Sequence, residues 1–398
     1  LIAMIALFRP GPMQWINEFI KRKKEPSLIV YPHKDLKPIL EETYGIAVYQ
    51  EQCLHAAHIM AGYSLGEADI LRRAIGKKKR KIMAKEKKRF IERAKKKKYS
   101  EETAQAVWRL IERFAGYGFN KAHSASYAMI AYQTAYMKVN YPIEFMAALL
   151  TAEANNKDKV ALAVEECRRI EIMVFPPDIN KSYGGFTVEE EPASREKKAI
   201  RFGFSAIKNV GTAAIEEILR VREIGGEFQS LSDFCLRVNA QKVNKKVLES
   251  LIKVGAMDKF GKRAAMLVGL DKIRTKVSFE QQKKAAGQTS LFENLKENNP
   301  GNRADDKLPE IEELEKNQLL SLEKKLLGFY LTENPLSFAL ARLEKRISHK
   351  LYEIDSLEYL GQKVKIGGIV TSIRRIFTRK GNNEMAFATI QSEGKKMD

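Results

Sequence analysis

The segment from residue 114 to residue 124 combines residue types that bind nucleotide phosphates. Its two glycines let a backbone approach a ligand closely, and Lys121 and His123 can supply positive charge or hydrogen bonds. The rings of Tyr117 and Phe119 can stack on a base. The glycine spacing differs from that of a Walker A loop. The same residues also fit a simple turn between two helices, with a buried aromatic ring and an already hydrogen-bonded histidine, so both interpretations stay open.

Helices are expected on both sides of this segment. One begins after Ser100 and carries an apolar stripe. The other runs from about Ser126 to Asn140, because Pro142 cannot continue it. The residues of this second helix that are expected to face inward are Tyr127, Ile130, Ala131, Thr134 and Met137. Met60 and Met129 are likewise expected in a core.

An earlier helix carries two arginines. Ser64 and Glu67 fit a capping box, in which each side chain binds the other residue's backbone amide. The helix that follows contains Arg72 and Arg73, and Gly76 is a plausible stop. Together these helices predict a compact helical domain.

Positive charge dominates the composition of the 398 residues, with a net charge of +20. Residues 77–98 hold fourteen Lys or Arg against Glu86 and Glu92, a net of +12. A solvated helix face and a membrane surface are the alternatives to a nucleic-acid partner. The apolar residues of this run are Ile82, Met83, Phe90 and Ile91, which suit packing on a core better than insertion into lipid. Phosphates of DNA or RNA are therefore the favoured partner.

Several classes of protein are excluded by the remaining composition. No apolar run approaches about 20 residues, so no membrane segment is predicted. Cys53, Cys167 and Cys235 lie too far apart for a CxxC motif, which predicts free thiols and a cytoplasmic location. His55 and His58 share one face of a probable helix near Cys53, but without a second ligand pair no metal site is predicted, and both are expected to pack inside. The start at Leu1 without an initiator Met indicates a fragment of a larger protein.

The pattern changes after Asn180. Residues 186–188 and 199–202 can pair as a hairpin, and 207–213 lead into a helix to about Arg222. The segment 207–213 resembles a helix-hairpin-helix turn, which presents backbone amides to a phosphate without reading base sequence. The predicted DNA-binding residues are Lys208, Asn209, Val210, Gly211 and Thr212, with Asn209 in place of the first glycine of the motif. A second, degenerate copy at 251–257 would add Lys253 and Gly255, or serve structure alone.

A short peptide follows that resembles the sliding-clamp-binding peptide of bacterial replication proteins. It consists of Gln288, Thr289, Ser290, Leu291 and Phe292, with the Leu-Phe pair isolated in a polar segment. An apolar groove on a partner can take such a pair while Gln288 and Ser290 make polar contacts. The alternative is a loop that tucks the pair under a neighbouring helix.

The C-terminal part predicts a linker and then strands. Residues 294–308 are polar, which predicts a flexible linker. From Lys363 apolar residues alternate, and a turn at 380–383 leads into a second alternating run at 385–390. These look like the first strands of an OB barrel that the chain leaves incomplete. Arg374, Arg375, Phe377, Arg379 and Lys380 would suit single-stranded nucleic acid. The acidic clusters 189–191 and 305–306 lie in expected polar loops and receive no catalytic role.

Four motifs occur in order along the chain. They are Leu-Phe-Arg-Pro-Gly-Pro at 7–12, Tyr-Gly-Ile followed by Tyr-Gln-Glu-Gln within 44–52, Leu-Arg-Arg-Ala-Ile-Gly-Lys-Lys-Lys at 71–79, and the segment 114–124. In this order they resemble the alpha subunit of bacterial DNA polymerase III. The resemblance continues through 175–180, the clamp peptide and 326–332, and so covers almost the whole chain.

This resemblance implies a multidomain, mainly α fold. Residues 1–178 would be the polymerase fingers, 179–293 a tandem helix-hairpin-helix region with the clamp peptide, 294–350 a linker and helical connector, and 351–398 an incomplete OB fold. The fingers would bind the incoming dNTP. The nucleotide-binding residues that it implies are Arg9, Arg72, Arg73, Lys77, Tyr117, Phe119, Asn120, Lys121 and His123.

The implied reaction is template-directed nucleotidyl transfer from a dNTP to a primer 3′-hydroxyl, assisted by two Mg²⁺ ions. The resemblance places the palm aspartates that hold the metals outside this chain, so no catalytic residue and no metal ligand is predicted in it, and the fragment alone is expected to be inactive. The implied partners are primer-template DNA, dNTP, the sliding clamp and other holoenzyme subunits. A non-enzymatic clamp-tethered DNA-binding protein and an error-prone translesion relative are the alternatives.

Overall fold

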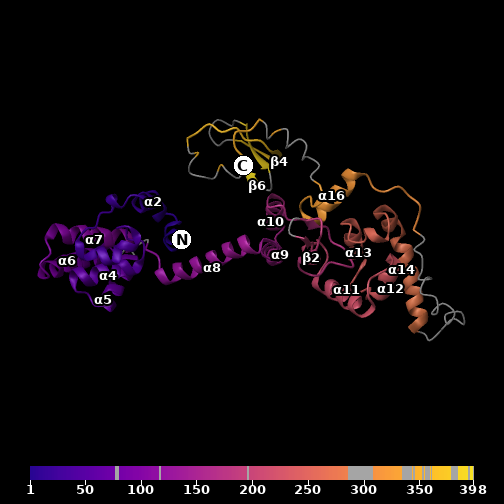
Figure 1. The fold of residues 1–398 in the computed structure, drawn as a ribbon, viewed down its shortest axis with the longest axis horizontal. Coiled ribbons are helices and arrows are strands. Elements are labelled where there is room, and N and C mark those ends of the chain that lie inside the picture. Colours follow the sequence, from indigo (N-terminus) through magenta and orange to yellow (C-terminus); the bar gives the residue numbers. More distant parts are fainter. Residues whose placement is uncertain are drawn as a thin grey trace. The chain divides into compact units, whose positions relative to one another are not determined.

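The computed structural model describes residues 1–76, 80–115, 118–194, 197–285 and 308–333, and beyond these 343, 346–351, 354, 359, 361–377, 384–392 and 395–397. The chain divides into two compact units, Leu1–Val139 and Asn140–Asp398. Figure 1 shows helices in both units, and small sheets occur only in the second among the described residues. The prediction of a mainly helical chain with small sheets is confirmed, whereas the domain boundaries at 178, 293 and 350 stay predictions.

The first unit is built from helices. The α-helices are α1 (Ile2–Leu7), α2 (Ile16–Lys24), α3 (Lys37–Leu40), α4 (Gln50–Ala61), α5 (Leu65–Gly76), α6 (Arg80–Lys96), α7 (Glu101–Ala115) and α8 (Lys121–Asn140). Its core contains Met60 of α4, Phe90 of α6 and Trp108 of α7, none of which is exposed. The Phe90 and Trp108 rings lie 5.6 Å apart, so apolar area and ring contacts both hold α6 on α7. Phe90 therefore packs on a core, as predicted for the apolar residues of the basic run.

The start of α5 confirms the predicted capping box. The Glu67 amide donates to Ser64 Oγ over 3.1 Å, and the Ser64 amide donates to Glu67 Oε2 over 2.9 Å. Glu67 also accepts hydrogen bonds from Arg89 and Arg93 of α6. One carboxylate thus closes the first turn of α5 and ties it to α6.

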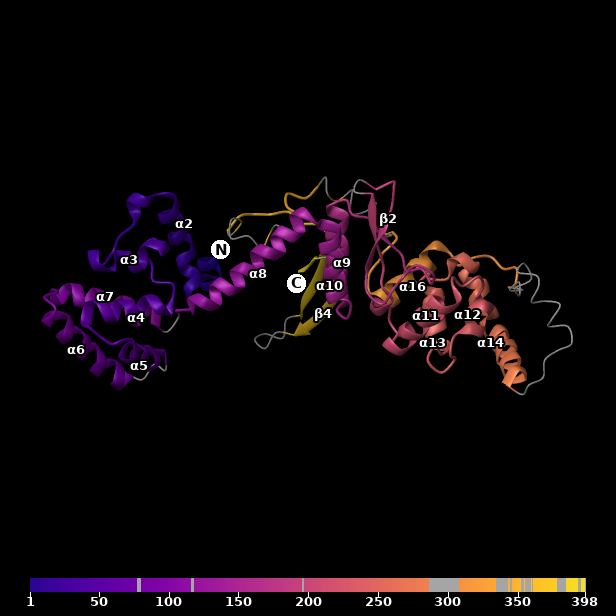
Figure 2. The same ribbon diagram turned by 60° about the horizontal axis from the view of Figure 1, so that its bottom comes forward.

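Helix α8 differs from the prediction in its start and in its exposure. It begins at Lys121 rather than near Ser126, so Lys121 and His123 lie in its first turn rather than in a loop. Tyr127, Ile130 and Met137 are 53%, 54% and 42% exposed, and the expectation that they face inward is wrong. Thr134 and Met129 are exposed as well. The physical reason is that α8 runs away from the packed helices of its unit (Figure 2), and Ser124 and Ala128 are its buried residues.

Two histidines of α4 also differ from expectation. His55 and His58 are exposed rather than packed inside. His58 Nδ1 lies 2.6 Å from the Tyr63 carbonyl oxygen, at the end of the helix. The described residues include no group of three His, Cys, Asp or Glu side chains that could hold a metal ion.

The second unit contains α9 (Pro142–Ala152), α10 (Lys157–Arg169), α11 (Thr212–Gly225), α12 (Leu231–Arg237), α13 (Lys245–Lys253), α14 (Arg263–Ala285) and α16 (Lys316–Leu327). Its first sheet has the order β1 (Val174–Phe175), β3 (Lys198–Arg201), β2 (Thr187–Glu190). The predicted hairpin is present, with Val188 opposite Ile200. The parallel pairing of β1 with β3 was not predicted. Glu189 and Glu190 lie in β2 rather than in a polar loop, and Glu189 accepts hydrogen bonds from Arg201.

A second sheet occupies the C-terminal part. It consists of β4 (Ile369–Phe377), β5 (Glu384–Ser392) and β6 (Lys395–Met397), paired antiparallel in that order. The alternating run at 385–390 predicted β5, whereas the first strand begins at Ile369 rather than at Lys363. No helix in the described part of the chain is long and apolar enough to cross a membrane.

The Glu67 cap generates a prediction on pH. Hydrogen bonds from the Ser64 amide and from Arg93 lower the pKa of Glu67 to about 2, from an ordinary 4.5. The ionised carboxylate therefore stabilises the first unit above pH 4.5, and this contribution is lost as the pH falls toward 2. Both tryptophans, Trp15 and Trp108, lie in this unit, so their fluorescence reports its unfolding alone. We expect Glu67→Gln to lower the urea midpoint at pH 7, with the difference from wild type narrowing below pH 4.5.

The matched control for this prediction is Glu92→Gln, an exposed carboxylate on α6. It should leave the midpoint unchanged at every pH. A Glu67→Gln difference that stays constant from pH 7 to pH 3 would contradict the role of the cap.

Candidate nucleotide and DNA interfaces

The candidate nucleotide site is organised by a short backbone bridge. Tyr49 and Phe119 form an isolated parallel β-bridge. The Phe119 amide donates to the Val48 carbonyl over 3.3 Å, and the Gln50 amide donates to the Phe119 carbonyl over 3.0 Å. This bridge holds the residues before α8 against the residues before α4.

A buried glutamine fixes the Val48–Tyr49 side of the bridge. Gln52 is 4% exposed, and its Oε1 accepts from the amides of Val48 and Tyr49 over 2.8 and 2.9 Å. Its Nε2 donates to the Ile39 carbonyl and to Thr43 Oγ1. Because the buried Gln52 side chain makes all four of these hydrogen bonds, the backbone at Val48–Tyr49 has little freedom to move.

Gln50 connects this bridge to α5. Its Nε2 donates to the Gly118 carbonyl over 2.9 Å, and its Oε1 accepts from Arg72 over 3.2 Å. Arg72 also pairs with Asp69 at 2.8 Å. Arg72 is thereby brought to the segment that contains Phe119.

Lys121 stands at the start of α8 between two carboxylates. Its backbone amide donates to both oxygens of Glu51 over 3.1 Å, which satisfies a free amide of the first turn. Its ammonium contacts Glu42 at 2.6 Å. Both side chains are exposed, so breaking this ion pair costs little free energy, and the ammonium can leave Glu42 for a more highly charged anion.

A row of rings and one guanidinium completes the site. Arg9 lies over the Phe119 ring at 4.3 Å, the Phe119 ring lies 5.3 Å from His123, and His123 lies 4.6 Å from Tyr127. Asn120 Oδ1 accepts from the His123 amide over 2.8 Å and so caps α8. Burial lowers the pKa of Arg9, and burial together with Glu42 and Glu51 raises the pKa of Tyr49 to about 12.

The structure thus brings six of the predicted nucleotide-binding residues to one place: Arg9, Arg72, Phe119, Asn120, Lys121 and His123. Arg73 is more exposed and pairs with Asp69 at 2.7 Å. Lys77 and Tyr117 lie outside the described residues. The sequence did not assign roles to Glu42, Gln50 and Glu51, and only the Tyr-Gln-Glu-Gln motif at 49–52 signalled the last two.

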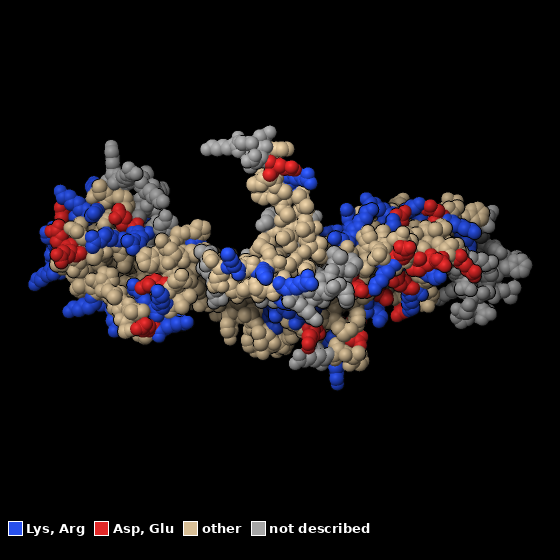
Figure 3. Space-filling view, turned by 90° about the horizontal axis from the view of Figure 1, so that it is seen from above, with Lys and Arg blue, Asp and Glu red and all other residues tan. Residues whose placement is uncertain are grey.

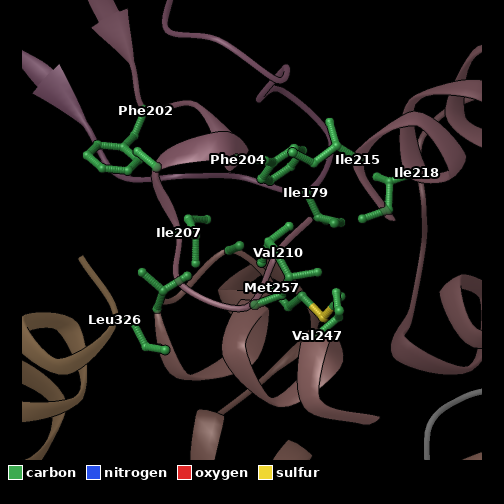
Figure 4. Close-up of a cluster of buried hydrophobic side chains, with 14 of the residues drawn as sticks. Ile179, Phe202, Phe204, Ile207, Val210, Ile215, Ile218, Val247, Met257 and Leu326 are labelled. Carbon is green, nitrogen blue, oxygen red and sulfur yellow. The ribbon is translucent and has the colours of Figure 1, made fainter. Parts of the chain in front are cut away.

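The helix-hairpin-helix turn lies between a short 3₁₀ helix (Phe204–Ala206) and α11. Ile207 and Val210 are buried in the core cluster drawn in Figure 4, together with Leu326. Asn209 has a φ of +72°, the left-handed region that costs most residues about 1–2 kcal/mol. Its side-chain amide donates to Ser250 Oγ over 3.0 Å. Asn209 therefore reproduces the geometry that a glycine gives the motif.

The two glycines of the predicted DNA-binding set differ in their surroundings. Gly211 has a φ of −88°, which any residue adopts, and a Cβ added there would have nothing within 4 Å. Gly255 has a φ of +88°, and a Cβ there would lie 2.1 Å from Arg263, which pairs with Asp258. Gly255 is therefore required by the fold, whereas the fold leaves Gly211 free to be another residue.

The second predicted copy of the motif, at 251–257, makes contacts with other parts of the protein. Lys253 pairs with Glu249 at 2.7 Å, and the Ala256 carbonyl accepts from the Ile179 amide. These contacts favour the structural alternative for 251–257, and DNA contact at Lys253 and Gly255 gains no support from them.

Basic side chains are scattered over the face of the first unit that Figure 3 shows, among acidic and other residues. On α6 the exposed lysines include Lys85, Lys88 and Lys96, whereas Arg89 and Arg93 bind Glu67. The basic run is thus partly structural and partly a solvent-facing cationic surface. In the second sheet, Arg374 lies over Phe387 and Arg375 pairs with Glu384.

The clamp peptide at 288–292 lies outside the described residues, as do Arg379 and Lys380.

Gln50 generates a prediction on stability. Gln50→Ala removes its hydrogen bonds to Gly118 and Arg72, and we expect it to lower the free energy of unfolding of the first unit by about 1–2 kcal/mol. Urea titrations followed by tryptophan fluorescence measure this, and faster hydrogen exchange of the Phe119 amide locates it at the bridge. Gln105→Ala is the control, because the hydrogen bond that Gln105 donates goes to Glu101 of its own helix. Equal effects of the two substitutions would contradict the role of Gln50.

Comparison with known proteins places these features in a family. Residues 1–98 match the bacterial DNA polymerase III alpha subunit finger domain, and residues 171–266 match the helix-hairpin-helix motif. The chain is 42% identical over 98% of its length to DNA polymerase III subunit alpha of Borreliella burgdorferi, and spans 33% of that protein. The corresponding values are 42%, 99% and 32% for the Thermus aquaticus subunit, and 40%, 96% and 33% for that of Escherichia coli K12.

The chain spans about one third of the length of these relatives. Over that third, it belongs to the family of bacterial DNA polymerase III alpha subunits.

Proposed function

We propose that this chain forms the part of a replicative DNA polymerase that binds the incoming dNTP and the phosphate backbone of duplex DNA. The polymerase would transfer a nucleotide from the dNTP to a primer 3′-hydroxyl. The relatives are DNA polymerase III alpha subunits, and the finger and helix-hairpin-helix matches support a nucleotide-binding and a DNA-binding role respectively.

The observation that carries the DNA-binding proposal is Gly211. Its φ is ordinary and its surroundings are open, so the missing side chain leaves room for a ligand to approach the backbone closely. Gly211 precedes α11, and the amides of Thr212 and Ala213 lie in a first turn that provides no acceptor within the helix. A phosphate oxygen at this turn would accept from these amides whatever the base sequence.

The nucleotide proposal rests on the cations around the Tyr49–Phe119 bridge. A triphosphate would take the Lys121 ammonium from Glu42, because several phosphate oxygens offer more negative charge than one exposed carboxylate. Arg72 and Arg9 would add charge, and the Phe119 ring, which already lies under Arg9, would limit the position of the nucleotide. Charged donors placed in this way stabilise the pyrophosphate that departs.

Mg²⁺ would be held outside this chain. The described residues provide no cluster of three carboxylates, histidines or cysteines. We further propose that the chain alone does not extend a primer.

The peptide Gln288–Phe292 would tether the polymerase to the sliding clamp through Leu291 and Phe292, with Gln288 and Ser290 as polar anchors.

The test of the proposed function uses Gly211→Ala. Since an added Cβ meets no protein atom within 4 Å, we expect the variant to fold with unchanged stability. It should bind a fluorescent duplex several-fold more weakly, because the methyl group keeps the phosphate from the turn. Fluorescence anisotropy measures the binding, and thermal unfolding followed by circular dichroism measures the stability.

The matched control is Gly226→Ala. A Cβ at Gly226 also meets nothing within 4 Å, but its φ is +71°, so this variant should lose stability and keep its DNA affinity. Unchanged duplex binding by Gly211→Ala would contradict a phosphate at the turn.

A further inference from the structure

A lysine outside the helix-hairpin-helix match lies at the same turn. Lys157 is the first residue of α10, and its ammonium donates to the Leu326 carbonyl over 2.9 Å. The backbone amide of Lys208, in the turn, donates to that same carbonyl over 3.1 Å. Leu326 lies in the last turn of α16, where carbonyls lack partners within the helix. Three segments far apart in the sequence thus meet at one oxygen atom.

The position of Lys157 is fixed by packing as well as by this hydrogen bond. A Cβ added at Gly328 would lie 3.0 Å from the Cβ and Cδ of Lys157, so the lysine stem fills the space above this glycine. The glycine has a φ of +97° and ends α16. A long, flexible side chain is therefore held in one place, which lowers the entropy lost when its ammonium binds a further group.

Lys157 and Lys208 place two positive charges near each other. Burial and then the charge of Lys208 lower the pKa of Lys157. Lys208 is exposed and makes no ion pair within the described part of the chain. The Lys157 ammonium has three donors, and one of them is used at Leu326. An anion between the two ammonium groups would relieve their repulsion and take the remaining donors.

We propose that Lys157 and Lys208 together bind one phosphate of the DNA backbone, next to the phosphate at the Gly211 turn. This inference rests on the proposed DNA binding and extends the contact surface from the turn to the start of α10. Lys157 would have two roles, since it also connects α10 to the end of α16. A structural role alone would need the hydrogen bond to Leu326 but not the positive charge.

The experiment separates charge from structure. Lys157→Gln keeps a hydrogen-bond donor and loses the charge, whereas Lys157→Arg keeps both. Dissociation constants for a fluorescent duplex are measured by anisotropy across a series of KCl concentrations. Each phosphate contact contributes about 0.9 to the slope of log affinity against log salt concentration. Because the two lysines share one phosphate, we expect the double variant Lys157→Gln/Lys208→Gln to reduce the slope by about 0.9. Each single Gln variant should reduce the slope by part of that amount and weaken binding several-fold at low salt, whereas Lys157→Arg should keep the wild-type slope and affinity.

The control is Lys159→Gln. Lys159 is exposed on the same helix and pairs with Glu153 at 2.8 Å, so its loss should leave the slope unchanged. A wild-type slope in Lys157→Gln, while Lys208→Gln or Gly211→Ala weakens binding, would overturn this inference and leave the proposed function standing. A chain that binds no duplex would overturn both.

Discussion

The parallel bridge between Tyr49 and Phe119 is the contact on which the candidate nucleotide site depends. Its two backbone hydrogen bonds join segments that are far apart in the sequence. Each neighbouring side chain then positions one cation: Gln50 holds Arg72, and Glu51 holds the Lys121 amide. Since α8 begins at Lys121, the same contact sets where this helix starts. The cations are therefore placed by backbone geometry and by carboxylates, rather than by a flexible loop.

The proposed DNA-binding turn has the opposite arrangement, because the first backbone amides of α11 find no acceptor within the helix. Gly211 has no side chain and no neighbour where a side chain would lie, and it opens α11 without a side-chain cap. The residues around it are firmly held, with Val210 buried and Asn209 bonded to Ser250. A rigid turn with an open face suits a ligand that is recognised by its phosphates and not by its bases.

The sequence predicted the features that depend on near neighbours. The Ser64–Glu67 cap, the hairpin at 187–201 and the presence of a helix after the turn at 207–213 each follow from a few adjacent residues. It misjudged α8, because an apolar face indicates a helix but not whether anything covers it. Glu42 beside Lys121 and Lys157 beside Lys208 were beyond prediction, since tertiary packing brings together segments that no local pattern connects. The helical positions of Lys121 and His123 were missed because glycines and aromatic rings suggested a longer loop.

The proposed exchange of Glu42 for a triphosphate at the Lys121 ammonium is tested by the affinity of three proteins for a fluorescent dNTP: the wild-type chain, Glu42→Gln and Lys121→Gln. Glu42→Gln removes the competing charge and should bind the dNTP more tightly than wild type, while Lys121→Gln should bind it more weakly. The difference should shrink as salt screens the exposed charges. Equal affinities in all three proteins, or weaker binding in Glu42→Gln, would contradict the account.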